Sequence, residues 1–299
     1  MRLKRTAFAV VAASMLVAVS ACGDAGDDDE GGSAPKAEVE ENAADNFDDG
    51  TAMKQLAEDG SVTIGVKIDQ PGIGFQGATD DIPSGFDIEV GKWLAADLGI
   101  KPEDVEWKET ISDNRERFIE DEEVDLVIAS YSITPERRAV VGQAGPYYVT
   151  GQQLMVQKDN DEIETVDDVK GKEVCSVTGS TSLDQVEAKG AEPRGFDTYS
   201  QCRDQVKDGT VDAMTTDGSI LLGYVAEDPD LLKVVGPEFS EERYGIGYAK
   251  DSPEMCTWIT DLVQEKMDNG DWAKAFEATL GQSGVETPEP PKMDACKSA

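Results

Sequence analysis

Histidine is missing from this chain, and basic residues are scarce. The 299 residues include no histidine and only 27 lysines and arginines, against 62 aspartates and glutamates, for a net charge of −35. Histidine is the usual general acid or base of enzymes and a common zinc ligand. A strongly acidic chain also repels nucleic acids and anionic membrane surfaces. We therefore expect no metal, no cofactor and no nucleic acid partner.

Long apolar runs are also absent, except at the start of the chain. Residues 1–21 combine a basic beginning, an apolar run and small residues before Cys22. This pattern predicts a secretory signal peptide, too short for a membrane span. The ending "VSAC" resembles a lipobox, which predicts cleavage before Cys22, lipid on that cysteine and anchoring at the extracellular face of the cell membrane. The alternative is an ordinary signal peptide cut near Ala21.

The segment that follows has little to bury. Residues 22–59 are rich in Gly, Ser, Pro and acids, so we expect a disordered acidic linker. Residues 285–299 form a proline-rich tail.

From about residue 60, strand and helix signals alternate, which predicts an α/β fold with mainly parallel sheets. For example, "GFDIEVGKWLAADLG" has apolar residues at helical spacing, and "STSLDQVEAKG" predicts a helix capped by Ser182. In such folds, ligands bind beyond the carboxyl ends of strands. The polar residues at these positions are Lys67, Ser130, Ser132, Thr178, Ser180, Thr181 and Asp217.

The stretch "SITPERR" places cations where a helix begins. Thr134 is a suitable N-cap and Pro135 a suitable first helical residue, so Arg137 falls in the first turn. The helix dipole disfavours a cation there. Either Arg137 extends into solvent, or an anion binds between the arginine and the helix end.

Three motifs together resemble the extracellular solute-binding proteins of polar amino-acid ABC importers. They are "GFDIEVGKWLAADLG", "VDLVIASYSITPERRAVVGQAGPYY" and "GTVDAMTTD", and the resemblance covers nearly all of 60–280. It implies a two-lobed, periplasmic-binding-protein-like (type II) fold with a hinge of two crossing strands and a ligand cleft between the lobes. Lobe one would comprise 60–150 plus 247–284, and lobe two 151–246. The expected partners are a free amino acid and the permease subunits of an ABC importer.

The resemblance also implies roles for individual residues. Arg137, with Ser130 and Ser132, would bind the ligand α-carboxylate from lobe one, and Thr181 would bind it from lobe two. Asp217 would bind the α-ammonium group. For Ser180 we expect ordinary capping, and for the other hydroxyl residues capping and turn roles remain the alternative. Plain N-capping is the alternative for Asp217.

The stretch "TISDNRERF" favours an acidic ligand. Its Ser112 and Arg115 resemble a segment of the glutamate/aspartate-binding lipoproteins in which the arginine meets the side-chain carboxylate. Lys67 falls where those proteins also place a cation, and Tyr199 aligns with a contact in the second lobe. The alternative is that Arg115 and Lys67 are surface cations and the ligand is glutamine or asparagine.

The four remaining cysteines allow three disulfide pairings. We favour Cys175 with Cys202 and Cys256 with Cys296, because each pair then lies within one region of the expected fold. Two other functions stay open on the same fold: a sensor that signals to a membrane partner, and a dehydratase. The missing histidine argues against the enzyme.

Overall fold

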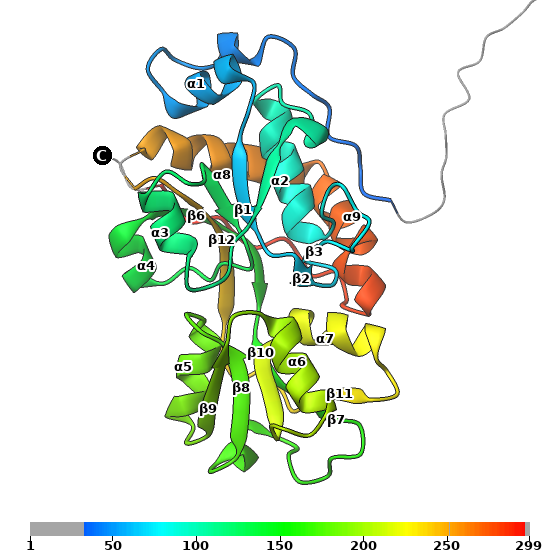
Figure 1. The fold of residues 1–299 in the computed structure, drawn as a ribbon. Coiled ribbons are helices and arrows are strands. Elements are labelled where there is room, and N and C mark those ends of the chain that lie inside the picture. Colours follow the sequence, from blue (N-terminus) through cyan, green and yellow to red (C-terminus); the bar gives the residue numbers. More distant parts are fainter. Residues whose placement is uncertain (1–32, 251, 297–299) are drawn as a thin grey trace, which may run out of the picture. The chain divides into compact units, whose positions relative to one another are not determined.

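The computed structural model describes residues 33–250 and 252–296, so the expected signal peptide and Cys22 lie outside the described residues. Two five-stranded sheets organise this part of the chain (Figure 1). The first sheet has the order β4-β1-β5-β12-β6 and belongs to lobe one; its strands are β1 (Thr63–Val66), β4 (Glu106–Glu109), β5 (Leu126–Ile128), β6 (Gly142–Thr150) and β12 (Glu242–Tyr248).

The second sheet belongs to lobe two and has the order β11-β7-β10-β8-β9. Its strands are β7 (Gln152–Gln157), β8 (Glu173–Val177), β9 (Glu192–Phe196), β10 (Ala213–Asp217) and β11 (Leu232–Val235). A short hairpin of β2 (Asp69–Gln70) and β3 (Gly74–Phe75) follows β1.

Helices accompany both sheets. In lobe one they are α1 (Ala52–Asp59), α2 (Phe86–Asp97), α3 (Arg115–Glu120), α4 (Pro135–Val140), α8 (Pro253–Asp268) and α9 (Asp271–Ala278). In lobe two they are α5 (Thr181–Ala188), α6 (Tyr199–Lys207) and α7 (Gly218–Glu227). Short 3₁₀ helices are η1 (Ala43–Asn46), η2 (Pro102–Asp104), η3 (Val166–Val169) and η4 (Leu280–Ser283). Among the described residues, no helix is both long and apolar enough to cross a membrane.

The chain crosses between the lobes twice. It leaves the first sheet at the end of β6, passes through Gly151 and enters the second sheet as β7. It returns as β12, which pairs with β6 from Glu242↔Thr150 onward. The return to the first sheet therefore begins at Glu242, and the boundary expected at 246/247 falls inside β12.

Each sheet is mixed, not mainly parallel. Strand β1 is parallel to β4 and β5, but β12 is antiparallel to both β5 and β6. In lobe two, β8 is parallel to β9 and β10, whereas β7 is antiparallel to β10 and β11. An alternation of strands and helices predicts parallel strands. Every antiparallel pair in these sheets includes β7 or β12, the strands with which the chain enters or leaves lobe two, so the alternation did not indicate them.

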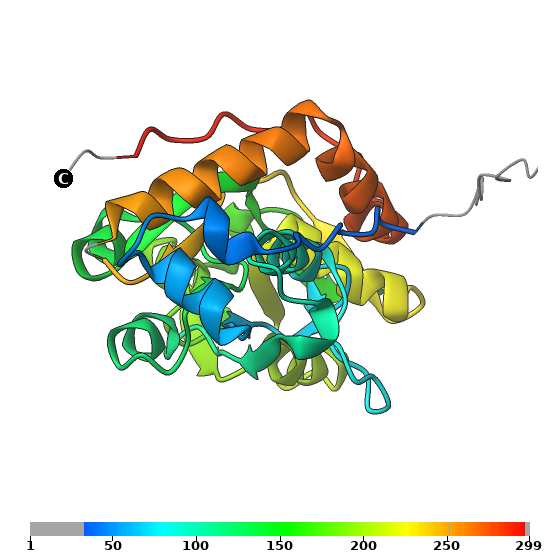
Figure 2. The same ribbon diagram turned by 90° about the horizontal axis from the view of Figure 1, so that it is seen from above.

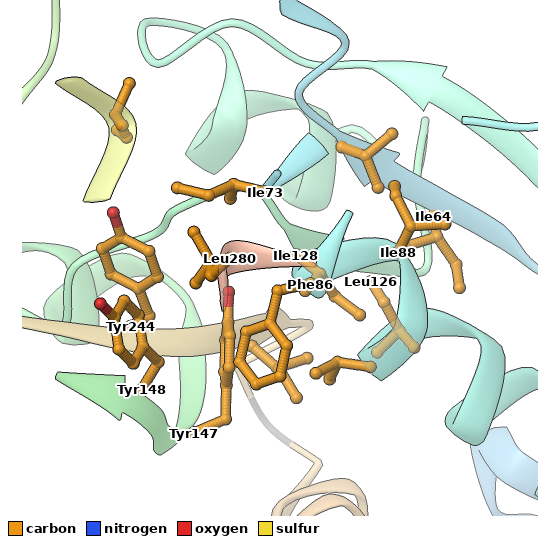
Figure 3. Packing of buried hydrophobic residues seen from close by; sticks show 14 of the residues in the cluster. Ile64, Ile73, Phe86, Ile88, Leu126, Ile128, Tyr147, Tyr148, Tyr244 and Leu280 are labelled. Carbon is orange, nitrogen blue, oxygen red and sulfur yellow. The ribbon is translucent and has the colours of Figure 1, made fainter. Parts of the chain in front are cut away.

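An aromatic cluster, which includes Phe86, Tyr147, Tyr148 and Tyr244, lies in the core of lobe one (Figure 3). Phe86, the first residue of α2, packs against Trp272 and Phe276 with ring centroids 5.4 and 5.3 Å apart. The next residue, Asp87, is fully buried, and burial raises its pKa to about 6. Asp87 accepts hydrogen bonds of 2.6 Å from the Tyr147 hydroxyl and from the backbone N–H of Ser130, which fixes the segment after β5.

The part of the expected linker that the structure describes is ordered, which corrects the prediction for residues 33–59. This part forms η1 and α1, and the N–H of Glu40 donates to the carbonyl of Ala96 at 2.9 Å. Ala43 and Met53 are buried, and Phe47 meets Trp258 edge to face at 6.1 Å. The prediction of disorder was based on the average composition, which is polar. An average does not show that a few apolar residues are spaced so that they can pack.

The cap predicted for α5 was wrong by two residues. The hydroxyl of Ser180 accepts the N–H of Leu183, so Ser180 is the N-cap, as expected of an ordinary capping residue, and Ser182 lies inside the helix. Thr134 caps α4 as predicted, by accepting the N–H of Arg137 at 3.2 Å.

Both predicted disulfides are confirmed. Cys175 of β8 is joined to Cys202 of α6, and Cys256 of α8 is joined to Cys296 of the tail. Figure 2 shows the tail running along α8. Near its end, the Asp294 carboxylate pairs with Arg138 at 2.9 Å and with Arg243 at 2.7 Å.

We expect the Cys256→Ser/Cys296→Ser variant to unfold at lower urea concentration than the wild type. The bridge spans 40 residues, and a loop of this length contributes roughly 3–4 kcal/mol to the free energy of unfolding. Equilibrium denaturation measures the loss, and Cys22→Ser serves as the control because Cys22 belongs to neither bridge. Peptide mapping that found crossed pairs would contradict the pairing.

Candidate functional site

The site is built from residues that follow strands of both sheets. In lobe one, Lys67 follows β1, Ser112 and Arg115 follow β4, and Ser130, Ser132 and Arg137 follow β5. In lobe two, Thr178 and Thr181 follow β8, Tyr199 begins α6 and Asp217 ends β10. The structure brings most of these residues together where the two lobes touch.

Lys67 lies deep in lobe one with only 3% of its surface exposed. Its Nζ donates to the hydroxyl of Ser112 at 3.0 Å. Burial, with the charge of Arg115 added, lowers the pKa of Lys67 to about 7. Such an amine gains most from a ligand that brings a negative charge.

Arg115 and Arg137 lie on the same aromatic ring and reach the same carbonyl group. Their guanidinium carbons are 4.5 and 5.1 Å from the centre of the Tyr131 ring. Their Nη2 atoms donate to the carbonyl of Gly179 in lobe two at 3.4 and 3.0 Å. Two buried cations of lobe one therefore meet the loop between β8 and α5.

Other contacts hold each guanidinium group in place. Arg137 donates to the carbonyl of Ser132 at 2.7 Å and pairs with Glu116 at 3.2 Å, while Arg115 donates to the carbonyl of Ala129 at 3.2 Å. Burial, and then the neighbouring charge of Arg137, lowers the pKa of Arg115 to about 10. Arg137 is buried, which excludes the solvated surface arginine that was the alternative.

Gly179 allows the lobes to approach closely. Its φ of +76° suits glycine, and a Cβ atom built there would lie 2.9 Å from the Cα atom of Asp113 in lobe one. A side chain at this position would push the two lobes apart.

Asp217 is the last residue of β10 and precedes the helix α7. It occupies the N-cap position of α7 but makes no capping hydrogen bond, so plain capping does not explain it. Its Oδ2 accepts the hydroxyl of Tyr244 at 2.5 Å. Burial, followed by the charge of Glu242, raises the pKa of Asp217 to about 8, while Arg115 and Arg137 oppose that shift.

Tyr199 belongs to the same group. It is buried, and burial raises the pKa of its hydroxyl to about 12, with the charge of Asp217 adding to the shift and Arg115 opposing it. Thr178 does not join the group, because its side chain is exposed and its hydroxyl lies beside Gly195 of β9.

Several buried polar atoms of the site lack a partner within the described chain. Arg115 Nε and Asp217 Oδ1 are a buried donor and a buried acceptor with no hydrogen bond. Gln70, which follows Lys67 closely in sequence and is fully buried, leaves both amide atoms unpaired. Buried polar groups of native proteins nearly always have a hydrogen-bond partner. The unpaired atoms therefore suggest a polar ligand that carries both a positive and a negative group.

Glu242 is the main site residue that the sequence did not indicate. It is 2% exposed and accepts hydrogen bonds from Ser132, Thr181, Gln185 and Ser240. It follows the exposed Glu241, and no periodic pattern in the sequence shows which of the two glutamates is buried. Among the described residues, no group of three or more acidic or cysteine side chains is placed to hold a metal ion.

This architecture, with charged groups of both signs where two lobes touch, defines a two-lobed binding protein. A family model for bacterial extracellular solute-binding proteins, family 3, matches residues 62–282. The chain belongs to this family, and the predicted type II fold is confirmed. The match ends before the proline-rich tail.

Individual relatives agree with this assignment. The glutamate-binding protein GluB of Corynebacterium efficiens is 38% identical over 252 residues, which cover 80% of this chain and 85% of the relative. The glutamine-binding protein of Geobacillus stearothermophilus is 32% identical over 212 residues, 70% of this chain and 80% of the relative. A solved structure of an ancestral arginine-binding protein bound to glutamine has a TM-score of 0.69 and 35% identity, and the match covers 74% of this chain and 98% of that one.

Proposed function

We propose that this protein is the extracellular binding component of an ABC importer and binds an acidic amino acid, glutamate or aspartate. The observation that carries the proposal is the charge arrangement of the site. Three buried cations, Lys67, Arg115 and Arg137, lie in lobe one, and the carboxylate of Asp217 comes from lobe two. An acidic amino acid has two carboxylates and one ammonium group, which complement this set.

Each charge of the ligand has a matching group. Arg137 is the proposed partner of the α-carboxylate, because a guanidinium group binds carboxylates in a bidentate geometry. Arg115 and Lys67, with Ser112 beside them, would bind the side-chain carboxylate. Asp217 would bind the α-ammonium group, and Tyr199 would line the lobe-two side.

The name of the glutamate-binding relative supports an acidic ligand. A neutral ligand, glutamine or asparagine, is the second candidate, because a 32% identical relative is named for glutamine binding. The relatives are solute-binding proteins, so we propose binding and delivery to a permease in preference to catalysis. A permease and an ATPase encoded beside this protein would support import over a sensor role.

A thermal-shift panel of the amino acids tests the function. Glutamate or aspartate at a hundredfold excess over its dissociation constant should stabilise the protein by about 2.7 kcal/mol. Two controls are D-glutamate, which has the same charges as L-glutamate, and glutarate, which has both carboxylates but no ammonium group. A larger shift with glutamine or asparagine would show that the preferred ligand is the amide and not the acid. No shift with any amino acid would refute the proposal that the protein binds amino acids.

We also propose that lipid on Cys22 anchors the protein to the membrane. Metabolic labelling with a palmitate analogue, followed by mass spectrometry, should find the lipid at the mature N-terminus. Cys22→Ser should release the protein into the medium or block its processing, whereas Ser20→Ala leaves the cysteine in place as a control. A Cys22→Ser protein that is processed and membrane-bound as usual would refute the anchor.

A further inference from the structure

The carboxylate of Glu242 accepts hydrogen bonds from four side chains, which come from both lobes. Its Oε2 accepts the hydroxyl of Ser132 at 2.6 Å and the hydroxyl of Thr181 at 2.9 Å. Its Oε1 accepts the amide of Gln185 at 2.8 Å and the hydroxyl of Ser240 at 3.0 Å. A surface glutamate would not hold four donors, and its neighbour Glu241 is exposed.

The donors come from opposite sides of the contact between the lobes. Ser132 lies between β5 and α4 of lobe one, and it bridges to Tyr244 of β12. Thr181 and Gln185 are one turn apart on α5 of lobe two. Glu242 itself begins the crossing strand β12, so one carboxylate oxygen links a hydroxyl group of each lobe.

These bonds determine what Ser132 and Thr181 can offer to a ligand. A hydroxyl group has one hydrogen and two lone pairs. Since both hydrogens are donated to Glu242, the two oxygens can only accept further hydrogen bonds. They suit an ammonium group, and they do not suit the ligand α-carboxylate that they were expected to bind.

The surroundings are acidic as well. Asp217 lies close enough to Glu242 for the two carboxylates to repel each other, and Tyr244, which donates to Asp217, lies two residues along β12. Two carboxylates and two hydroxyl oxygens therefore lie in one part of the site, and Arg137 reaches the backbone carbonyl of Ser132, not its hydroxyl group.

We infer that Glu242 is a positioning residue, which turns one hydroxyl group from each lobe into an acceptor for the ligand ammonium group. Recognition of the ammonium group is thereby linked to contact between the lobes. The inference deepens the proposed function and rests on it.

A comparison of glutamate with glutarate, which lacks the ammonium group, tests this role. In Glu242→Ala, glutamate should bind about tenfold more weakly or worse, the loss expected from hydrogen bonds that involve charged groups. Glutarate should bind nearly as it does to the wild type, so the preference for glutamate should shrink. Glu242→Gln, which keeps the shape and one carbonyl oxygen, should restore part of the preference.

Titration calorimetry measures both ligands on the three proteins, with Glu241→Gln as a control for removing one nearby charge. Circular dichroism melting checks that each variant is folded, and Glu242→Gln carries the test if Glu242→Ala is not. An equal loss for glutamate and glutarate, or an unchanged preference in both variants, would overturn the inference. Wild-type protein that binds no amino acid would instead refute the proposed function, and the inference with it.

Discussion

Arg137→Ala is expected to abolish binding of every amino acid. All amino acids share the α-carboxylate that Arg137 is proposed to bind, and the side chain of Arg137 is buried. A buried ionic group that loses its partner costs about 3–5 kcal/mol, which corresponds to roughly 10²- to 10³-fold or more in Kd. Titration calorimetry with glutamate, aspartate, glutamine and asparagine should therefore detect no binding at ordinary protein concentrations.

The neighbouring arginine provides the matched control. Arg138 lies on the same helix but pairs with Asp294 of the tail and donates to the carbonyl of Gln143. Arg138→Ala removes the same charge from the same helix and should keep wild-type affinity. If Arg137→Ala binds glutamate as well as Arg138→Ala does, Arg137 is not the carboxylate ligand.

Arg115→Gln and Lys67→Gln should change which ligand is preferred. Both side chains are buried, and they are the proposed partners of the ligand side-chain carboxylate. Loss of a buried, hydrogen-bonded charge pair costs about 2–5 kcal/mol, so glutamate and aspartate should bind roughly 30-fold to several thousandfold more weakly. Glutamine and asparagine should be spared or improved, because a neutral amide needs no cation and can pair with the new glutamine.

Two cations outside the proposed site, the exposed Arg117 and the half-buried Lys108, serve as controls for this pair of variants. Arg117 lies on the same short helix as Arg115, and Lys108 lies on β4 near the surface, where it pairs with Glu123. Arg117→Gln and Lys108→Gln should leave the ratio of acid to amide affinity unchanged. An unchanged ratio in Arg115→Gln and Lys67→Gln as well would remove the main support for an acidic ligand.

The sequence predicted the elements that have a strong local signal. The helix α2 was predicted because Phe86, Val90, Trp93 and Leu94 recur at helical spacing, and all four are buried. The cap and first residue of α4 followed from the Thr-Pro pair. Strand β9 was missed, because most of its residues are exposed or half-buried and it contains Pro193 and Gly195.

The sequence could predict only those site residues that follow a strand or belong to one of the motifs. Strand ends and motifs indicated Lys67, Arg115, Arg137 and Asp217, and the structure places these side chains near enough to shift one another's pKa values. Glu242 was missed because three of its four partners are distant in sequence, Ser132 being 110 residues away. The direction of the hydroxyl groups of Ser132 and Thr181 depends on that same glutamate, so local sequence could not reveal it.

The two crossings make lobe two an insertion that could be exchanged as a unit. Thr150 and Glu242 face each other in neighbouring strands, about 5 Å apart as in any antiparallel pair, so a short turn could join them directly. Both ends of the described chain pack on lobe one, through Glu40 and through the bridge to Cys296. Recombination between relatives at these two neighbouring points would therefore transfer Thr181, Tyr199 and Asp217 together while the three cations of lobe one stayed behind. Such a chimera would take Asp217, the proposed partner of the ammonium group, from one parent and the three cations of lobe one from the other.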